Sequence, residues 1–162
     1  MFLPIITWPA KVLETKASLV EVFDDELKQF VENMFDTMKD SKGIGLAANQ
    51  VGSLRRVIVI DIPHNNHSHS HTFINPEIIK KEGSFKFKEG CLSFPQIFES
   101  IDRSEKVTVR AQNIFGEFFE LEAEGLFAVC IQHEIDHLEG IVFTKRMSRL
   151  KADIVNRKML KR

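Results

Sequence analysis

The chain has 162 residues with a formal net charge of −1, and 43% of its residues are hydrophobic. This length predicts a single domain over residues 1–162, and the near-neutral charge argues against general nucleic-acid binding. Two cysteines cannot build a disulfide framework, and no segment resembles a secretory signal or a membrane span of ~20 apolar residues. We therefore expect a cytoplasmic protein without a membrane partner.

The first third of the chain predicts a helix, a loop and a strand. Apolar residues recur at helical spacing after Asp24 or Asp25, either of which could cap the helix, until Gly43. Small residues at 43–50 predict a loop. The apolar run at 57–60 then predicts a buried strand.

Further strands are expected in the middle of the chain. The histidine-rich stretch 63–71 is predicted to be a solvated loop, with secondary metal binding as the alternative, and 73–79 is a return strand. Alternation at 107–109 and 119–123, on either side of the turn residues 113–116, predicts a hairpin.

Two helices complete the predicted fold, one over residues 125–140 and one beginning after Ser148. These elements together predict an α+β fold with antiparallel β-sheets packed around the central helix. The apolar side of the C-terminal helix is expected to dock through Met147, Leu150, Ile154 and Val155.

The central helix carries the sequence His-Glu-x-x-His at residues 133–137. Its two histidines lie one turn apart on one face, where both can bind a single metal ion. Glu134 directly follows the first histidine and can accept a proton from a water molecule at the metal, so it is a candidate general base. The motif supplies two ligands and still requires a third.

The sequence after the motif offers little for that third ligand. It contains no Cys, His or Glu beyond Glu139, and its only acidic residue is Asp153. Phe143 stands where a longer metalloprotease pattern has its third histidine. Both common protease arrangements are therefore disfavoured.

Cys91 is the best upstream candidate. It lies in Glu-Gly-Cys-Leu-Ser, where the adjacent glycine allows close approach of the backbone. Cys130 instead fits an apolar helix face and is expected to pack in the core. A site of Cys91, His133 and His137 leaves the fourth position to water, as catalytic sites require.

Three separated blocks resemble the motifs of bacterial peptide deformylases in order and in approximate spacing. They are Gly-Ile-Gly-Leu-Ala-Ala-Asn-Gln at 43–50, Glu-Gly-Cys-Leu-Ser at 89–93 and Gln-His-Glu-Ile-Asp-His-Leu-Glu-Gly at 132–140. The resemblance spans nearly the whole chain, and three blocks together are highly specific. Residues 94–98, which are bulkier than is usual in that family, are a visible departure.

The resemblance implies a hydrolase that removes the formyl group from N-formylmethionyl nascent peptides and releases formate. It implies one divalent metal ion, Fe²⁺ in the cell, with Zn²⁺, Ni²⁺ or Co²⁺ also compatible. The Gln50 side chain and the Leu92 backbone N–H would stabilise the oxyanion. Substrate contacts are implied for Ile44, Gly45, Phe87, Gly90, Leu126, Val129 and Cys130, with Arg103 near the mouth of the methionine pocket.

Two other functions share the metal helix. A zinc-dependent endopeptidase would cleave internal peptide bonds, and a non-catalytic metal-stabilised binding module would have a fourth protein ligand in place of water.

The C-terminal segment 144–162 is strongly basic, with Asp153 as its only acid. Charge runs are usually solvated faces, but the resemblance implies a helix that attaches to the ribosome near the exit tunnel. The basic residues are Lys145, Arg146, Arg149, Lys151, Arg157, Lys158, Lys161 and Arg162.

Overall fold

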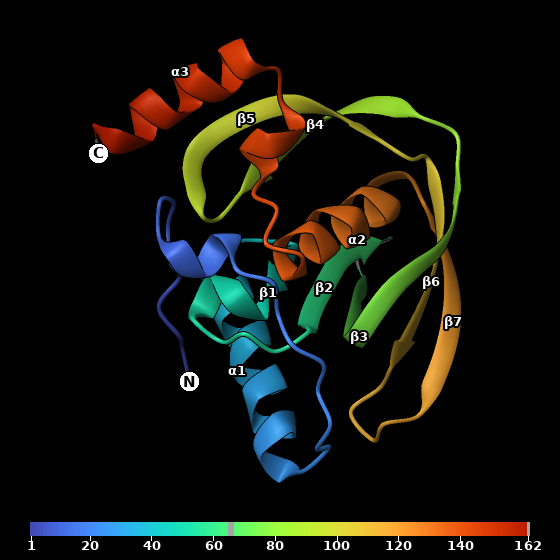
Figure 1. Ribbon diagram of the computed structural model, residues 1–162. Helices are drawn as coiled ribbons and strands as arrows, with labels where there is room; N and C mark the ends of the chain where they lie inside the picture. The colour runs from blue at the N-terminus through green and yellow to red at the C-terminus, as the bar shows by residue number, and fades with distance from the viewer. Residues whose placement is uncertain (65–66, 162) are drawn as a thin grey trace.

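In its described residues, 1–64 and 67–161, the protein combines two antiparallel sheets with three α-helices, as a computed structural model shows (Figure 1). The side chains of residues 63–68 are outside this description. The helices are α1 (Asp25–Asp40), α2 (Gly125–Leu138) and α3 (Arg149–Leu160), with short 3₁₀ helices η1 (Lys11–Glu14), η2 (Ala48–Val51) and η3 (Phe143–Arg146). The predicted α+β class is confirmed.

The larger sheet has the strand order β1-β2-β3-β6-β7, and β4 pairs with β5 in a separate sheet. Figure 1 shows α2 at the centre, with the curved pair β4–β5 above it and the larger sheet below and beside it. The strands are β1 (Gly45–Ala47), β2 (Val57–His64), β3 (His67–Glu82), β4 (Phe85–Cys91), β5 (Phe94–Arg103), β6 (Lys106–Gln112) and β7 (Phe118–Glu124).

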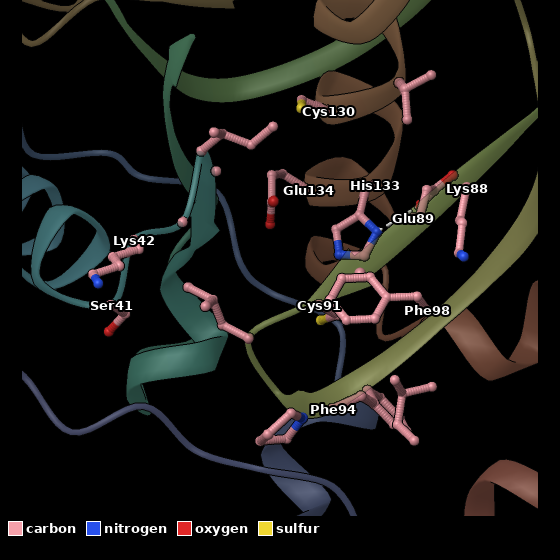
Figure 2. Close-up of a pocket in the computed structure, with 18 of the residues that line it drawn as sticks. Ser41, Lys42, Lys88, Glu89, Cys91, Phe94, Phe98, Cys130, His133 and Glu134 are labelled. Carbon is pink, nitrogen blue, oxygen red and sulfur yellow. Dashed lines mark hydrogen bonds and ion pairs between the residues drawn. The ribbon is translucent and has the colours of Figure 1, made fainter. Parts of the chain in front are cut away.

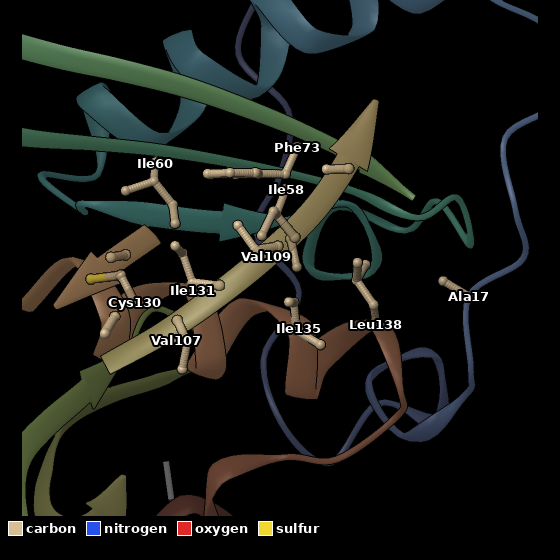
Figure 3. Packing of buried hydrophobic residues seen from close by; sticks show 14 residues of the cluster. Ala17, Ile58, Ile60, Phe73, Val107, Val109, Cys130, Ile131, Ile135 and Leu138 are labelled. Carbon is tan, nitrogen blue, oxygen red and sulfur yellow. The ribbon is translucent and has the colours of Figure 1, made fainter. Parts of the chain in front are cut away.

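Helices α1 and α2 cover opposite faces of the larger sheet. Because successive strand residues point to opposite faces, Ile58 packs in the cluster that contains Ile131 and Leu138 of α2 (Figure 3). Its neighbour Val59 packs in the cluster that contains Met34 of α1. Each such buried side chain contributes about 1.5–3 kcal/mol. This burial fixes α2 against the sheet.

Helix α2 is buried along most of its length, including its polar residues. Gln132, His133, Glu134, Asp136 and His137 all lie below 9% exposure. Buried polar groups are costly unless they have partners, so these side chains require specific neighbours.

Helix α1 confirms the first predicted helix. The Asp24 side chain accepts a hydrogen bond from the Leu27 backbone N–H at 3.0 Å, which makes Asp24 the N-cap. The helix ends at Asp40, and the Gly43 N–H donates to the Met38 carbonyl at 2.9 Å.

None of the helices in the described part of the chain is long and apolar enough to span a membrane.

Two predicted loops are in part regular structure. Residues 43–50 contain β1, whose Gly45 pairs with Ile60, and most of η2. The loop predicted for 63–71 is wrong in its extent, because the β2–β3 ladder continues to the pair His64–His67. Residues 65–66 lie outside the described residues, and the alternative metal site stays a prediction.

Helix α3 begins after Ser148, as predicted, and the Ser148 side chain caps it by accepting from the Lys151 backbone N–H at 3.2 Å. The prediction of its apolar side was partly wrong. Val155 is buried and Met147 packs on the same cluster, but Leu150 and Ile154 are 73% and 45% exposed. The buried face of the helix differs from the predicted one, because Val155 and Met159, four residues apart, face the protein.

Candidate active site

A pocket of about 510 Å³ lies where β1, the β4–β5 pair and α2 meet (Figure 2). Glu134 and His133 of α2 face it from one side, and Cys91 at the end of β4 faces it from the other. The predicted site residues that line it are Ile44, Gly45, Gln50, Phe87, Gly90, Cys91, Leu92, Leu126, Val129, Cys130, His133 and Glu134.

Cys91, His133 and His137 converge as predicted for metal ligands. Their candidate ligand atoms all lie within 4.8 Å of one another, and Cys91 Sγ is 3.3 Å from His137 Nε2. The ladder between β4 and β5 shifts its register between Gly90 and Cys91, next to the thiol. A thiolate with two imidazoles is a donor set that suits a divalent transition metal.

The protonation of this cluster is set by its surroundings. Burial opposes a charged His133, but the Cys91 thiolate and the Glu134 carboxylate outweigh it and hold the pKa of His133 above its usual range. Burial, with the charge of His133, lowers the pKa of His137. A divalent cation held by these residues would take the place of the His133 proton as the counter-charge to the thiolate.

The His133 ring is oriented by Glu89. The Nδ1 atom of His133 lies 2.9 Å from Glu89 Oε1, which leaves its Nε2 for a metal. Burial alone would raise the pKa of Glu89, but hydrogen bonds from Arg103 and His133 outweigh burial and hold this pKa below its usual value. Glu89 therefore stays ionised behind the ligand.

Arg103 does not lie at the mouth of the pocket, so that prediction was wrong. It is 5% exposed and donates from Nε and Nη2 to Glu89 at 2.6 and 2.9 Å. Its Nη1 donates to Asp136 at 2.7 Å. Two buried carboxylates hold the guanidinium behind the candidate ligand His133, because a charge buried without partners would be far more costly.

Glu134 has the environment of a proton carrier. Burial raises its pKa to about 7, and its Oε1 has no hydrogen-bond partner among the described residues. A β-carbon at Gly45 would lie 2.6 Å from Glu134 Oε2, so the glycine makes room for the carboxylate. A group with a pKa near neutrality can accept a proton and return it.

The Gln50 amide is held in one orientation. Its Oε1 accepts from the Ala47 N–H at 3.0 Å, and its Nε2 donates to Ser93 Oγ at 3.1 Å and towards Cys91 Sγ at 3.7 Å. The donor end of the amide therefore faces Cys91, one of the three candidate ligands.

Cys130 is a packing residue, as its helical phase predicted. It is buried in the cluster that covers the larger sheet, and its sulfur is outside the ligand group formed by the described residues. Burial raises the pKa of its thiol well above the ordinary value. It therefore stays protonated where it lines the pocket.

Glu89 and Asp136 were assigned no role from the sequence, although both lie inside the motifs at 89–93 and 132–140. Lys88 and Gly90 flank Glu89, and His137 follows Asp136, so the local sequence does not indicate that either carboxylate is buried. A carboxylate on a buried element requires a cationic partner, and Arg103 is that partner for both.

The comparisons with known proteins agree with this site. The family model for polypeptide deformylase matches residues 2–153. A peptide deformylase from Chromobacterium violaceum is 49% identical over 160 residues, which covers 99% of this chain and 95% of that protein. The solved peptide deformylase from Legionella pneumophila is 43% identical with a TM-score of 0.94, covering 99% of this chain and 95% of that one. The chain therefore belongs to the polypeptide deformylase family.

Proposed function

We propose that this enzyme hydrolyses the N-formyl group of N-formylmethionyl nascent peptides in the cytoplasm, with residues 1–162 as one catalytic domain. The observation that carries the proposal is the convergence of Cys91, His133 and His137 beside Glu134 in a largely apolar pocket. Family membership supports the reaction, and a cytoplasmic location keeps the thiolate in a reducing environment.

Cys91, His133 and His137 would hold one divalent ion. When bound, such an ion lowers the pKa of water and polarises a carbonyl oxygen. The soft thiolate and two imidazoles suit Zn²⁺, Co²⁺ and Ni²⁺ as well as Fe²⁺, and the resemblance favours Fe²⁺ as the ion in the cell.

Glu134 moves the proton in this reaction. It accepts a proton from the attacking water as the oxygen bonds to the formyl carbon. It then returns that proton to the leaving nitrogen as the C–N bond breaks. The products are formate and a peptide with a free N-terminal amine.

The Gln50 side-chain amide and the Leu92 backbone N–H are proposed to stabilise the negative oxygen. Both residues line the pocket, and the Gln50 donor end faces Cys91. One donor of this kind is worth about 2.7–4 kcal/mol in other enzymes.

An extended peptide is proposed to bind along the walls of the pocket. Backbone groups of Ile44, Gly45 and Gly90 are available beside it, in the manner of strand addition. The methionine side chain would occupy the apolar end of the pocket, which is formed by Phe87, Leu126, Val129 and Cys130.

We expect Gly45→Ala to reduce kcat by about 10²-fold, because the new β-carbon would displace the Glu134 carboxylate by a fraction of an ångström or more. Gly43→Ala is the matched control. Its β-carbon would meet only the flexible end of Leu92 at 2.7 Å, so its loss of rate should be smaller. Steady-state kinetics on a formylmethionyl peptide compare the two. An equal loss in both variants would contradict the role given to Gly45.

The two alternative functions make different products. An endopeptidase would cleave unblocked peptides internally, whereas the proposed enzyme releases formate from a blocked peptide and leaves its other bonds intact. A binding module would release nothing. Mass spectrometry of a formylated peptide and its unformylated twin separates all three, and internal cleavage of the unformylated twin would refute the proposal.

We also propose that the basic face of α3 binds the ribosome near the exit tunnel. Val155 and Met159 anchor the helix in the protein, while Arg157, Lys158 and Lys161 are exposed. Arg146 and Lys151 are paired with Asp136 and Glu99 and have less free charge to offer.

Charge reversal at Arg157 and Lys158 should weaken co-sedimentation with ribosomes. The slope of the logarithm of the binding constant against the logarithm of the salt concentration should also fall, by the equivalent of roughly two phosphate contacts. The matched control reverses two exposed lysines elsewhere, Lys11 and Lys28. Hydrolysis of a short formyl-peptide should be unaffected by either pair. Equal ribosome binding by both double variants at low salt would contradict a specific role for α3.

A further inference from the structure

We propose that Arg146 is a positioning residue for the metal ligand His133 and acts through Asp136, Arg103 and Glu89. The inference rests on the proposed metal site. Arg146 lies outside the three sequence blocks, at the last position of η3, where the chain leaves α2 for the C-terminal helix.

The outer half of this chain of contacts is centred on Asp136. Arg146 donates from Nη2 to Asp136 Oδ1 at 2.8 Å and from Nε to Oδ2 at 3.1 Å. Arg103 Nη1 donates to the same Oδ2 atom at 2.7 Å. Asp136 therefore divides its charge between two guanidinium groups, one of which is bound in a two-pronged geometry.

The inner half of the chain is centred on Glu89. Arg103 donates from Nε and Nη2 to its two oxygens, and Glu89 Oε1 lies 2.9 Å from His133 Nδ1. This oxygen fixes the ring orientation and the basicity of the nitrogen that faces the metal.

Burial makes the balance of charge in this network important. The side chains of Arg103 and Glu89 are 4% exposed and that of Asp136 is 12% exposed, while that of Arg146 is 43% exposed. Two guanidinium groups match two carboxylates. Without Arg146, a single guanidinium serves both buried carboxylates, and Asp136 competes with Glu89 for it.

Loss of Arg146 is therefore expected to draw Arg103 towards Asp136 and to weaken the contact between Glu89 Oε1 and His133 Nδ1. Phe143, in the same 3₁₀ helix, packs its ring 6.1 Å from that of His133. A purely structural role for Arg146 would lower the stability of the fold without changing the ligand field at the metal.

The test uses the full chain loaded with Co²⁺, with the visible absorption spectrum and the rate of cobalt release to a chelator as readouts. Glu89→Gln should raise the rate of cobalt release by roughly 10–100-fold, and Arg146→Ala should raise it by roughly tenfold. Both variants should also shift the visible absorption band of the bound cobalt. Arg146→Lys should restore part of the retention. Lys145→Ala, which removes the exposed neighbouring charge, should match the wild type.

A double variant tests whether the effect passes through Glu89. If it does, Glu89→Gln with Arg146→Ala should release cobalt no faster than Glu89→Gln alone. Fully additive losses, or a wild-type spectrum and release rate in Arg146→Ala, would overturn the inference. If Arg146→Ala does not fold, Arg146→Gln, which removes the charge but keeps a long side chain, takes its place, and wild-type behaviour of that variant in both readouts would equally overturn the inference. Failure of the wild-type chain to bind cobalt would instead overturn the metal site itself.

Discussion

Replacement of Glu134 by glutamine is expected to remove nearly all formate release while metal stays bound. The amide cannot accept the proton of the attacking water, and general acid–base catalysis typically contributes about 10²–10⁴-fold in rate. Cys91, His133 and His137 are unchanged in this variant, so the metal content should equal that of the wild type. Parallel metal analysis and formate assays measure the two properties separately.

The matched control for this variant is Glu120→Gln, which makes the same change on an exposed position of β7. It should retain wild-type turnover and metal. Near wild-type formate release by Glu134→Gln would exclude Glu134 as the general base. Loss of metal together with activity would instead indicate that Glu134 supports the ligands.

Replacement of Cys91 by serine is the second change with a large expected effect. A hard, neutral hydroxyl replaces a soft thiolate, so affinity for zinc, cobalt or iron should fall by at least the roughly 10–100-fold seen when only a partner of a ligand is lost. The cobalt-substituted protein should also lose its thiolate-to-metal charge-transfer absorption. Equilibrium competition with a chelator measures the affinity.

Cys130→Ser is the control for the choice between the two cysteines. Cys130 lies outside the ligand group formed by the described residues, so its replacement should keep one metal ion per chain and the charge-transfer band. If Cys130→Ser lost the band and Cys91→Ser retained it, the ligand assignment would be reversed.

Local patterns in the sequence were enough to predict the three α-helices and the hairpin β6–β7. The spacing of apolar residues identified α1, and Asp24 was recognisable as a possible cap. The two histidines on one helix face need no tertiary information to be paired. Cys91 was chosen as their partner by elimination and from its adjacent glycine, and the family resemblance supported that choice. Only the fold shows β4 approaching α2 from a distant part of the chain.

Interactions between distant segments explain what sequence reasoning missed. Arginine is usually exposed at the surface, and only the fold brings Glu89 and Asp136 to either side of Arg103. The stretch 63–71 has polar loop composition, yet the β2–β3 ladder extends through most of it. Leu150 was predicted to be buried as part of the apolar side of the helix, but the protein covers α3 at Val155 and Met159 instead.

The central claim is that a metal ion at Cys91, His133 and His137 and the base Glu134 together release formate. The most direct test is to titrate metal-free protein anaerobically with Fe²⁺ or Co²⁺ while formate release from a formylmethionyl peptide is measured. We expect activity to rise in proportion to added metal and to stop rising at one ion per chain. Full activity in metal-free protein, or no formate release at one bound ion per chain, would contradict the account.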